Sequence, residues 1–418
     1  MSGIILLIVI VFVLLIYTTI PDIFLHRMGI GAWKRQYQPG VALTFDDGPD
    51  PTYTPRLLDL LDRYQVKATF FLVGERAAQH PELVQEIVTR GHQIGVHCQV
   101  HQHAWLMSPW KTWQVWTKGI ATLERLTGSP IHWIRPPWGT FNLFTFLWFK
   151  HHKLRAILWS TEGHDWEARR TPEQIAERIL HKVQEGGIIV LHDSGGDSAA
   201  PENTLRAVEL LLQRIPVEKK LPILPLNLPD WTEYRRLAYR LWEKWENFYA
   251  RQNHITRINS TSLFRLGKIK YHGPDLRDEQ GVVLAHEGDI VGELHLDNTR
   301  LQMQQTDSQK IAIEALRKAR TSLPVLADYI AKSPEYQDIR VFVGLTLINR
   351  GAKGLGFNVQ EVPVSPFVRW VGTLQRMIMR IYHPMGKSHR MNRLGEPKIV
   401  WVSKESLIHR WSSLSPHA

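Results

Sequence analysis

Thr44-Phe45-Asp46-Asp47-Gly48-Pro49 closes an apolar run that begins at Gly40, and it is the first of five short polar clusters in the chain. The run over 40–45 predicts a buried strand, and Gly-Pro ends that strand. Because neighbouring side chains on a strand diverge, Asp46 and Asp47 can divide two tasks. One carboxylate can bind a metal while the other takes a proton.

The other four clusters each follow a predicted strand in the same way. They are His97-Cys98-Gln99-Val100-His101, Arg135-Pro136-Pro137-Trp138-Gly139, Asp165-Trp166 and Leu191-His192-Asp193. Strands predicted over 67–73, 93–96, 131–134, 156–159, 188–191 and 223–228 alternate with helices predicted over 54–64, 82–90, 110–126, 172–185 and 203–214. This alternation indicates a parallel sheet or barrel. In (β/α) barrels the carboxyl ends of the strands carry the catalytic residues.

The histidine pair has the spacing of a metal site. Two imidazoles four residues apart can point at one divalent ion, and one carboxylate completes a three-ligand site that leaves positions for water. Such a site, with a base and an acid nearby, suffices to hydrolyse an amide. Taken singly, Asp-Asp-Gly-Pro is an ordinary turn, and a chain with 20 histidines forms His-x3-His pairs by chance. Five clusters in this order favour the hydrolytic site.

In order and spacing these clusters resemble those of the polysaccharide deacetylases of the NodB-homology type, carbohydrate esterase family 4. The resemblance covers residues 38–228. It implies an α/β fold, a distorted (β/α) barrel, and removal of acetate from N-acetylated sugars. It further implies that Asp47, His97 and His101 bind a divalent metal, with zinc expected first and cobalt, nickel or manganese as alternatives.

The same resemblance implies how the remaining residues act. Asp46 would be the general base that deprotonates the metal-bound water, and Arg135 would orient Asp46. His192 would be the general acid, and Asp165 would hold it and favour its protonated form.

Three further residues would bind the substrate. Trp166 and Leu191 would line the groove that receives the acetyl methyl. The backbone N–H of Trp138 would help to stabilise the oxyanion. The implied substrate is an N-acetylglucosamine-type residue of cell-wall glycan.

The N-terminus predicts a membrane anchor. The apolar run over 4–16 extends to Ile20, which gives about 25 Å of helix. No Lys or Arg precedes the run and no small-x-small site follows it, so residues 1–25 fit an uncleaved transmembrane helix better than a cleaved signal peptide. Arg27, Lys34 and Arg35 on the C-terminal side favour a cytoplasmic catalytic part. The resemblance to wall-modifying enzymes favours the outside, and we expect a single-pass bacterial membrane protein with an extracytoplasmic catalytic domain.

Residues 229–418 form a second predicted domain, separated by the proline-rich segment 221–229. Its helical and extended segments indicate an α+β fold, with a hairpin over 282–296 that turns at Glu287-Gly288-Asp289. It resembles a domain of unassigned function found after some bacterial deacetylase domains. It carries 28 Lys and Arg against 19 Asp and Glu, whereas residues 1–228 carry 23 against 21. This excess of positive charge would suit binding to anionic lipid or acidic wall polymer. The alternative is an ordinary basic surface that faces solvent. No nucleic-acid motif is present, so we expect no nucleic-acid partner.

Three functional hypotheses follow. The first is a membrane-anchored, metal-dependent N-deacetylase of cell-wall glycan. The second keeps this chemistry but faces the cytoplasm and acts on a lipid-linked or nucleotide-linked sugar. The third is a catalytically silent scaffold that binds glycan or membrane.

Overall fold

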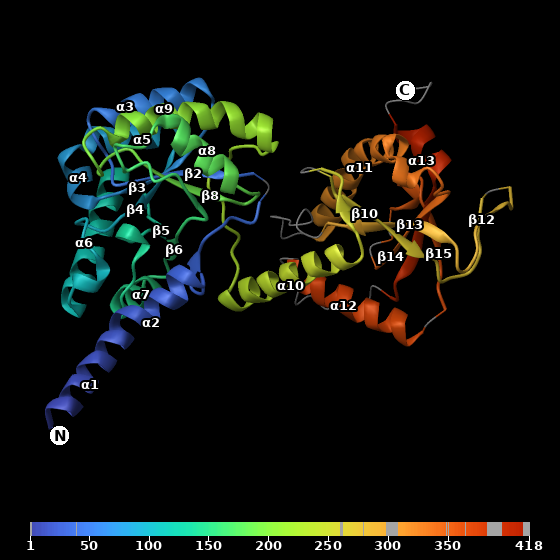
Figure 1. The fold of residues 1–418 in the computed structure, drawn as a ribbon, viewed down its shortest axis with the longest axis horizontal. Coiled ribbons are helices and arrows are strands. Elements are labelled where there is room, and N and C mark those ends of the chain that lie inside the picture. Colours follow the sequence, from blue (N-terminus) through green and yellow to red (C-terminus); the bar gives the residue numbers. More distant parts are fainter. Residues whose placement is uncertain are drawn as a thin grey trace. The chain divides into compact units, whose positions relative to one another are not determined.

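A computed structural model describes the chain except residues 1, 39, 260–261, 279, 298–307, 348, 350, 364, 383–394 and 413–418, and the side chains of residues 2, 308–315 and 379–382. The chain divides into two compact units, Met1–Leu228 and Pro229–Ala418 (Figure 1). Part of the basic C-terminal region, residues 383–394, lies outside the described residues.

The first unit contains one sheet of eight described strands in the order β1-β6-β5-β4-β3-β2-β8-β7, and every pair is parallel. The strands are β1 (Ala32–Trp33), β2 (Ala42–Asp46), β3 (Thr69–Leu72), β4 (Gln93–Val96), β5 (Trp133–Ile134), β6 (Arg155–Ile157), β7 (Thr161–Glu162) and β8 (Ile188–His192). The sheet curls into a half-barrel with β1 and β7 as its edges. This confirms the predicted distorted barrel.

Helices cover the sheet, as a parallel sheet requires when both of its faces are apolar (Figure 1). They are α3 (Tyr53–Arg63), α4 (Gly74–Gln79), α5 (Pro81–Thr89), α6 (Pro109–Thr127), α7 (Leu143–His151), α8 (Pro172–Lys182) and α9 (Ala200–Arg214). The start of α8 shows why the sequence predicted it well. Thr171 caps the helix in a capping box with Gln174, and Pro172 occupies the first turn.

The predicted last strand over 223–228 is wrong. In this segment Ile223 makes a single isolated bridge to Val41. The prolines at 222, 225 and 229 explain the error, because each removes a backbone donor that a strand would need.

The N-terminal residues form a helical stretch that projects from the first unit (Figure 1). Its parts are α1 (Ser2–Leu14), η1 (Leu15–Thr19), α2 (Ile20–Asp22) and η2 (Ile23–Arg27). By length and composition, Gly3–Arg27 can cross a membrane.

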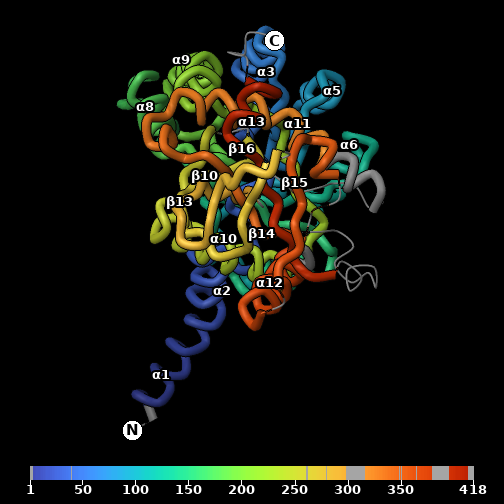
Figure 2. The backbone as a smooth tube through the Cα atoms, turned by 90° about the vertical axis from the view of Figure 1, so that its right-hand side faces the viewer, coloured from blue at the N-terminus to red at the C-terminus, as the bar shows by residue number. Residues whose placement is uncertain are grey.

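The second unit has an α+β fold, as predicted. Its main sheet has the order β15-β16-β14-β13-β10-β9, and these strands run side by side in Figure 2. The strands are β9 (Thr256–Arg257), β10 (Phe264–Lys270), β11 (Leu276–Arg277), β12 (Val283–Ala285), β13 (Ile290–Leu296), β14 (Val341–Thr346), β15 (Asn358–Gln360) and β16 (Lys398–Ser403). The helices are α10 (Glu233–Gln252), α11 (Ser308–Lys332), α12 (Pro366–Tyr382) and α13 (Lys404–Trp411).

The hairpin predicted over 282–296 is wrong in its pairing. The turn is present, with Gly288 at a φ of 97°. However, β12 pairs with β11, and β13 pairs with β10 and β14. A local turn signal predicts where the chain reverses direction. It does not predict that β13 pairs with β10 and β14 instead of with β12.

Candidate active site

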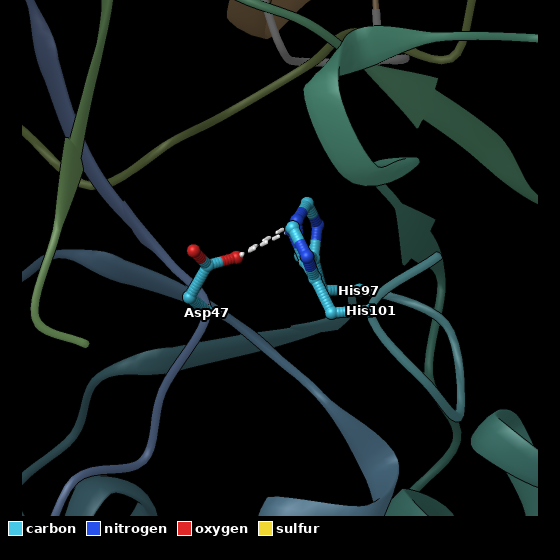
Figure 3. Close-up of side chains that lie close together, drawn as sticks. All are labelled: Asp47, His97 and His101. Carbon is cyan, nitrogen blue, oxygen red and sulfur yellow. Dashed lines mark ion pairs between the residues drawn. The ribbon is translucent and has the colours of Figure 1, made fainter. Parts of the chain in front are cut away.

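Asp47, His97 and His101 converge in the first unit (Figure 3). Asp47 directly follows β2 and has a φ of 74°, a left-handed conformation that is uncommon outside glycine. Both histidines come from the loop after β4, and their imidazoles face the same carboxylate oxygen. Nε2 of His97 lies 3.3 Å from Oδ1 of Asp47, and Nε2 of His101 lies 3.0 Å from it.

These three side chains fit a divalent metal. One ligand atom from each lies within 4.8 Å of the others. Ligands about 2.0–2.1 Å from a common ion are separated by about 2.8–3.4 Å in octahedral or tetrahedral geometry, and the two contacts of Asp47 fall within this range. Oδ1 of Asp47 is buried and makes no hydrogen bond to any described residue. Burial alone would raise the pKa of Asp47, but the contacts with His101 and His97 hold it well below its usual range.

The loop that carries both histidines is fixed from two sides. The first N–H groups of α4 donate to it, from Gly74 to the Cys98 carbonyl and from Glu75 to the Gln99 carbonyl, each at 2.9 Å. On the other side the loop packs against Gly119 of α6, where a Cβ would lie 2.9 Å from the Gln99 nitrogen. The thiol of Cys98 is buried and its pKa is raised to about 12 by that burial, so it stays protonated beside the candidate metal ligands.

Gly119→Ala is expected to weaken zinc binding. Alanine normally favours a helix interior by about 1 kcal/mol over glycine, but here its Cβ would meet the loop backbone and displace His97 and His101. We expect zinc affinity, measured by competition with a chromogenic chelator, to fall at least several-fold. Gln114→Ala on the exposed side of the same helix is the control. Equal affinities in the two variants would show that this contact does not position the loop.

Asp46 forms a buried ion pair with Arg135. Nη1 of Arg135 donates to Oδ1 of Asp46 at 2.7 Å and to the Thr44 hydroxyl at 2.8 Å. Other N–H groups of Arg135 donate to the carbonyls of Ile157 and Leu158. Burial lowers the pKa of Arg135, and the charge of Asp46 opposes that shift. The pair therefore fixes the orientation of the Asp46 carboxylate.

His192 and Asp165 form a second pair at the same edge of the sheet. His192 is the register partner of Asp46 across β8 and β2, which puts both side chains on one face. Nδ1 of His192 lies 3.0 Å from Oδ1 of Asp165. Burial would lower the pKa of His192, but Asp165 first, and then Asp47 and Asp46, raise it to about 10. The surrounding carboxylates therefore favour the protonated form of His192.

The three residues predicted to bind substrate occupy different environments. Trp138 is 53% exposed and its ring lies 4.3 Å from that of His101. Trp166 meets the ring of His192 edge-on at 5.5 Å. Leu191 is completely buried in the hydrophobic core. Trp138 and Trp166 thus flank the candidate site on two sides.

Several residues that support the site were not predicted. Thr44 and Asp46 are two apart on β2, so both reach Arg135, and this period of two was the available signal. Thr204 of α9 donates to Asp165, and Arg76 of α4 donates to the Asp47 carbonyl at 2.7 Å. Thr204 and Arg76 lie on helices 39 and 29 residues away from the aspartates that they contact, and nothing in their local sequence indicates this role.

Asp193 is a further buried carboxyl that was not predicted to act. Its Oδ2 accepts a hydrogen bond from Thr54, and its carboxyl group would meet a Cβ placed on Gly48. Burial raises its pKa to about 7. It braces the turn that follows Asp47.

The chain matches two family models. Residues 34–157 match the polysaccharide deacetylase family, and residues 235–411 match the YkoP domain, which has no assigned function. A peptidoglycan-N-acetylglucosamine deacetylase of Bacillus cereus is 38% identical over 159 residues, which are 38% of this chain and 74% of that protein. A chitooligosaccharide deacetylase of Sinorhizobium fredii is 31% identical over 194 residues, which are 44% of this chain and 87% of that protein.

A solved structure of a peptidoglycan N-acetylglucosamine deacetylase is also similar, with 29% identity, a TM-score of 0.45, and coverage of 49% of this chain and 94% of its own. The family match covers the first three polar clusters, and the two deacetylases are matched over 74% and 87% of their own lengths. The chain therefore belongs to the polysaccharide deacetylase family, the NodB-homology hydrolases of carbohydrate esterase family 4.

Proposed function

We propose that this protein hydrolyses the acetamido group of N-acetylglucosamine-type residues in cell-wall glycan and releases acetate. The observation that carries the proposal is the convergence of the Asp47, His97 and His101 ligand set with two separate buried pairs, one suited to a base and one to an acid. The relatives from Bacillus cereus and Sinorhizobium fredii are named for deacetylation of N-acetylated glycans, which supports this substrate class.

A divalent ion held by Asp47, His97 and His101 would polarise the amide carbonyl and acidify a water, and zinc suits two imidazoles and one carboxylate. Asp46 accepts the proton of the attacking water, because its buried ion pair with Arg135 fixes its orientation. The backbone N–H of Trp138 donates to the oxygen that gains charge in the transition state.

The second half of the reaction needs an acid for the leaving nitrogen. His192 donates the proton to that nitrogen, and its raised pKa keeps the proton available. Asp165 is a positioning residue, since it accepts from Nδ1 and leaves Nε2 to face the substrate. Trp166 bounds the space for the acetyl methyl, whereas Leu191, which is completely buried, presents no surface to it.

Asp165→Asn is expected to lower acetate release and to shift its pH profile. A group with a raised pKa works below that pKa and loses its proton as the pH rises through it. Removing the Asp165 charge lowers the pKa of His192, so the alkaline limb of kcat against pH moves to lower pH. A purely structural role for Asp165 would reduce activity equally at every pH and leave the limb in place.

The test of the proposed activity is acetate release by the metal-replete full chain in detergent. We expect acetate and free amine from N-acetylglucosamine oligomers and from peptidoglycan, and loss of both on chelation. Glycan binding with metal bound but without acetate release would instead support a silent scaffold.

We also propose that the N-terminal helix anchors the protein in a bacterial membrane with the catalytic unit outside. The length and apolar composition of Gly3–Arg27 support the span, and the wall substrates of the relatives support the side. Protease added to intact cells after removal of the wall is expected to degrade both units. Full protection would instead favour a cytoplasmic enzyme that acts on a lipid-linked or nucleotide-linked sugar.

A further inference from the structure

The exposed part of the N-terminal helix is too short to cross a bilayer by itself. Residues 4–16 are all exposed and span about 20 Å, whereas the hydrocarbon core is about 30 Å thick. A span of that thickness must continue to about Phe24. Over residues 17–25 one side of the helix is buried, including Pro21 and Leu25, while Ile20 and Phe24 on the other side stay exposed.

The buried side of this segment contacts the catalytic unit at two places. The Tyr17 hydroxyl donates to the Met107 carbonyl at 2.5 Å, and its ring lies 6.2 Å from that of Phe144 on α7. The Asp22 carboxylate accepts from the Phe141 N–H at 3.1 Å. The surface around Met107 and α7 therefore lies beside residues 17–24, the part of the helix that is needed to complete a membrane span.

That surface has the composition of a membrane interface. It comprises residues 104–113 and 143–153, which we call the interfacial face. Its large exposed side chains are Trp105 (43%), Leu106 (77%), Trp110 (79%), Trp113 (36%) and Leu147 (43%). The two segments contain three lysines and no acidic residue. Tryptophan and lysine at the level of a helix end are typical of proteins that sit in the headgroup region.

We propose that the interfacial face lies in the headgroup region of the bilayer that the N-terminal helix spans. The proposal rests on the proposed membrane anchor and adds a second, peripheral contact with the same lipid surface. The helix supplies the attachment, and the tryptophans of the interfacial face fix the tilt and depth of the catalytic unit.

A row of rings connects this face to the metal ligands. Trp105 lies 5.4 Å from His103, His103 lies 5.5 Å from Trp138, and Trp138 lies 4.3 Å from His101, measured between ring centroids. The contact therefore holds the mouth of the active site beside the membrane surface, where it meets glycan close to the bilayer.

The test is the depth of spin labels in the full chain, reconstituted in vesicles of phosphatidylcholine and phosphatidylglycerol. Cys98 is completely buried and is the single cysteine, so new cysteines are labelled selectively. Three variants are compared: Val9→Cys in α1, Leu106→Cys in the interfacial face, and Val217→Cys. Val217 is a matched apolar control because it is 73% exposed. It follows α9, which lies at the end of the unit opposite α1 in Figures 1 and 2.

Accessibility to oxygen, which concentrates in lipid, is measured against accessibility to a water-soluble nickel chelate. We expect a lipid-like ratio at Val9 and Leu106, several-fold above the ratio at Val217. A water-like ratio at Leu106 with a lipid-like ratio at Val9 would overturn the inference and leave the anchor standing. Water-like ratios at both would overturn the anchor as well. Acetate release by the same labelled proteins reports on the deacetylase chemistry independently of either result.

Discussion

Asp46→Asn is expected to lower kcat for acetate release by about 10²–10⁴-fold, the usual contribution of a general base. Asparagine preserves the shape of Asp46 and an oxygen acceptor for Arg135, but it cannot take a proton. Glu162→Gln is the matched control, because Glu162 is a carboxylate at the end of β7 whose Oε2 accepts from the Trp159 indole, a bond that glutamine can keep. Near wild-type rates in Asp46→Asn would contradict the assignment of the base.

The same variant must be checked for folding, because Arg135 is fully buried. Breaking a buried ion pair by removing one charge costs about 3–5 kcal/mol, and the oxygen that asparagine retains should reduce this cost. Denaturant unfolding of wild type and variant measures the difference. If the variant still unfolds cooperatively, its loss of activity is caused by loss of the general base and not by misfolding.

The second large effect is expected at the metal ligands. His97→Ala should abolish stoichiometric zinc binding and acetate release, since two ligands remain of a three-ligand set. In the wild type, zinc at 100 times its Kd should raise the free energy of unfolding by about 2.7 kcal/mol, and His97→Ala should lose this gain.

The control for this substitution is His181→Ala, an exposed histidine on α8. It should retain bound zinc, activity and the stabilisation by metal. Wild type, His97→Ala and His181→Ala are compared in the same two measurements. Thermal unfolding with and without zinc gives the stabilisation by metal, and metal analysis of the dialysed proteins gives the bound zinc. Zinc retained by His97→Ala would contradict the proposed ligand set.

The sequence predicted most of the site because the fold brings strand ends together. Asp47, His97 and His192 are far apart in the chain. Asp47 and His97 directly follow strands of one parallel sheet and His192 ends another, and the carboxyl ends of such strands share an edge. The residues that hold these groups were harder to find. Thr204 and Arg76 act through helices whose packing against the site depends on the whole unit.

The second unit shows the corresponding limit for the fold. Glu287-Gly288-Asp289 marks a real turn, yet β13 pairs over seven residues with β10 rather than with β12. Pairing over that length buries a larger apolar face, and competition between distant segments is not encoded in a turn. The strand predicted over 223–228 was wrong for another reason. Its apolar residues indicated a strand, but the prolines in and beside this segment prevent regular pairing.

Attack of a water on the acetamido group is tested most directly by hydrolysis in water enriched in heavy oxygen, with the zinc-loaded full chain and an N-acetylglucosamine oligomer. We expect acetate that carries one solvent oxygen and an oligomer with a free amine for each acetate released, analysed together by mass spectrometry. An unchanged oligomer in the presence of bound zinc, or acetate without solvent oxygen, would contradict hydrolysis by a water that Asp46 deprotonates.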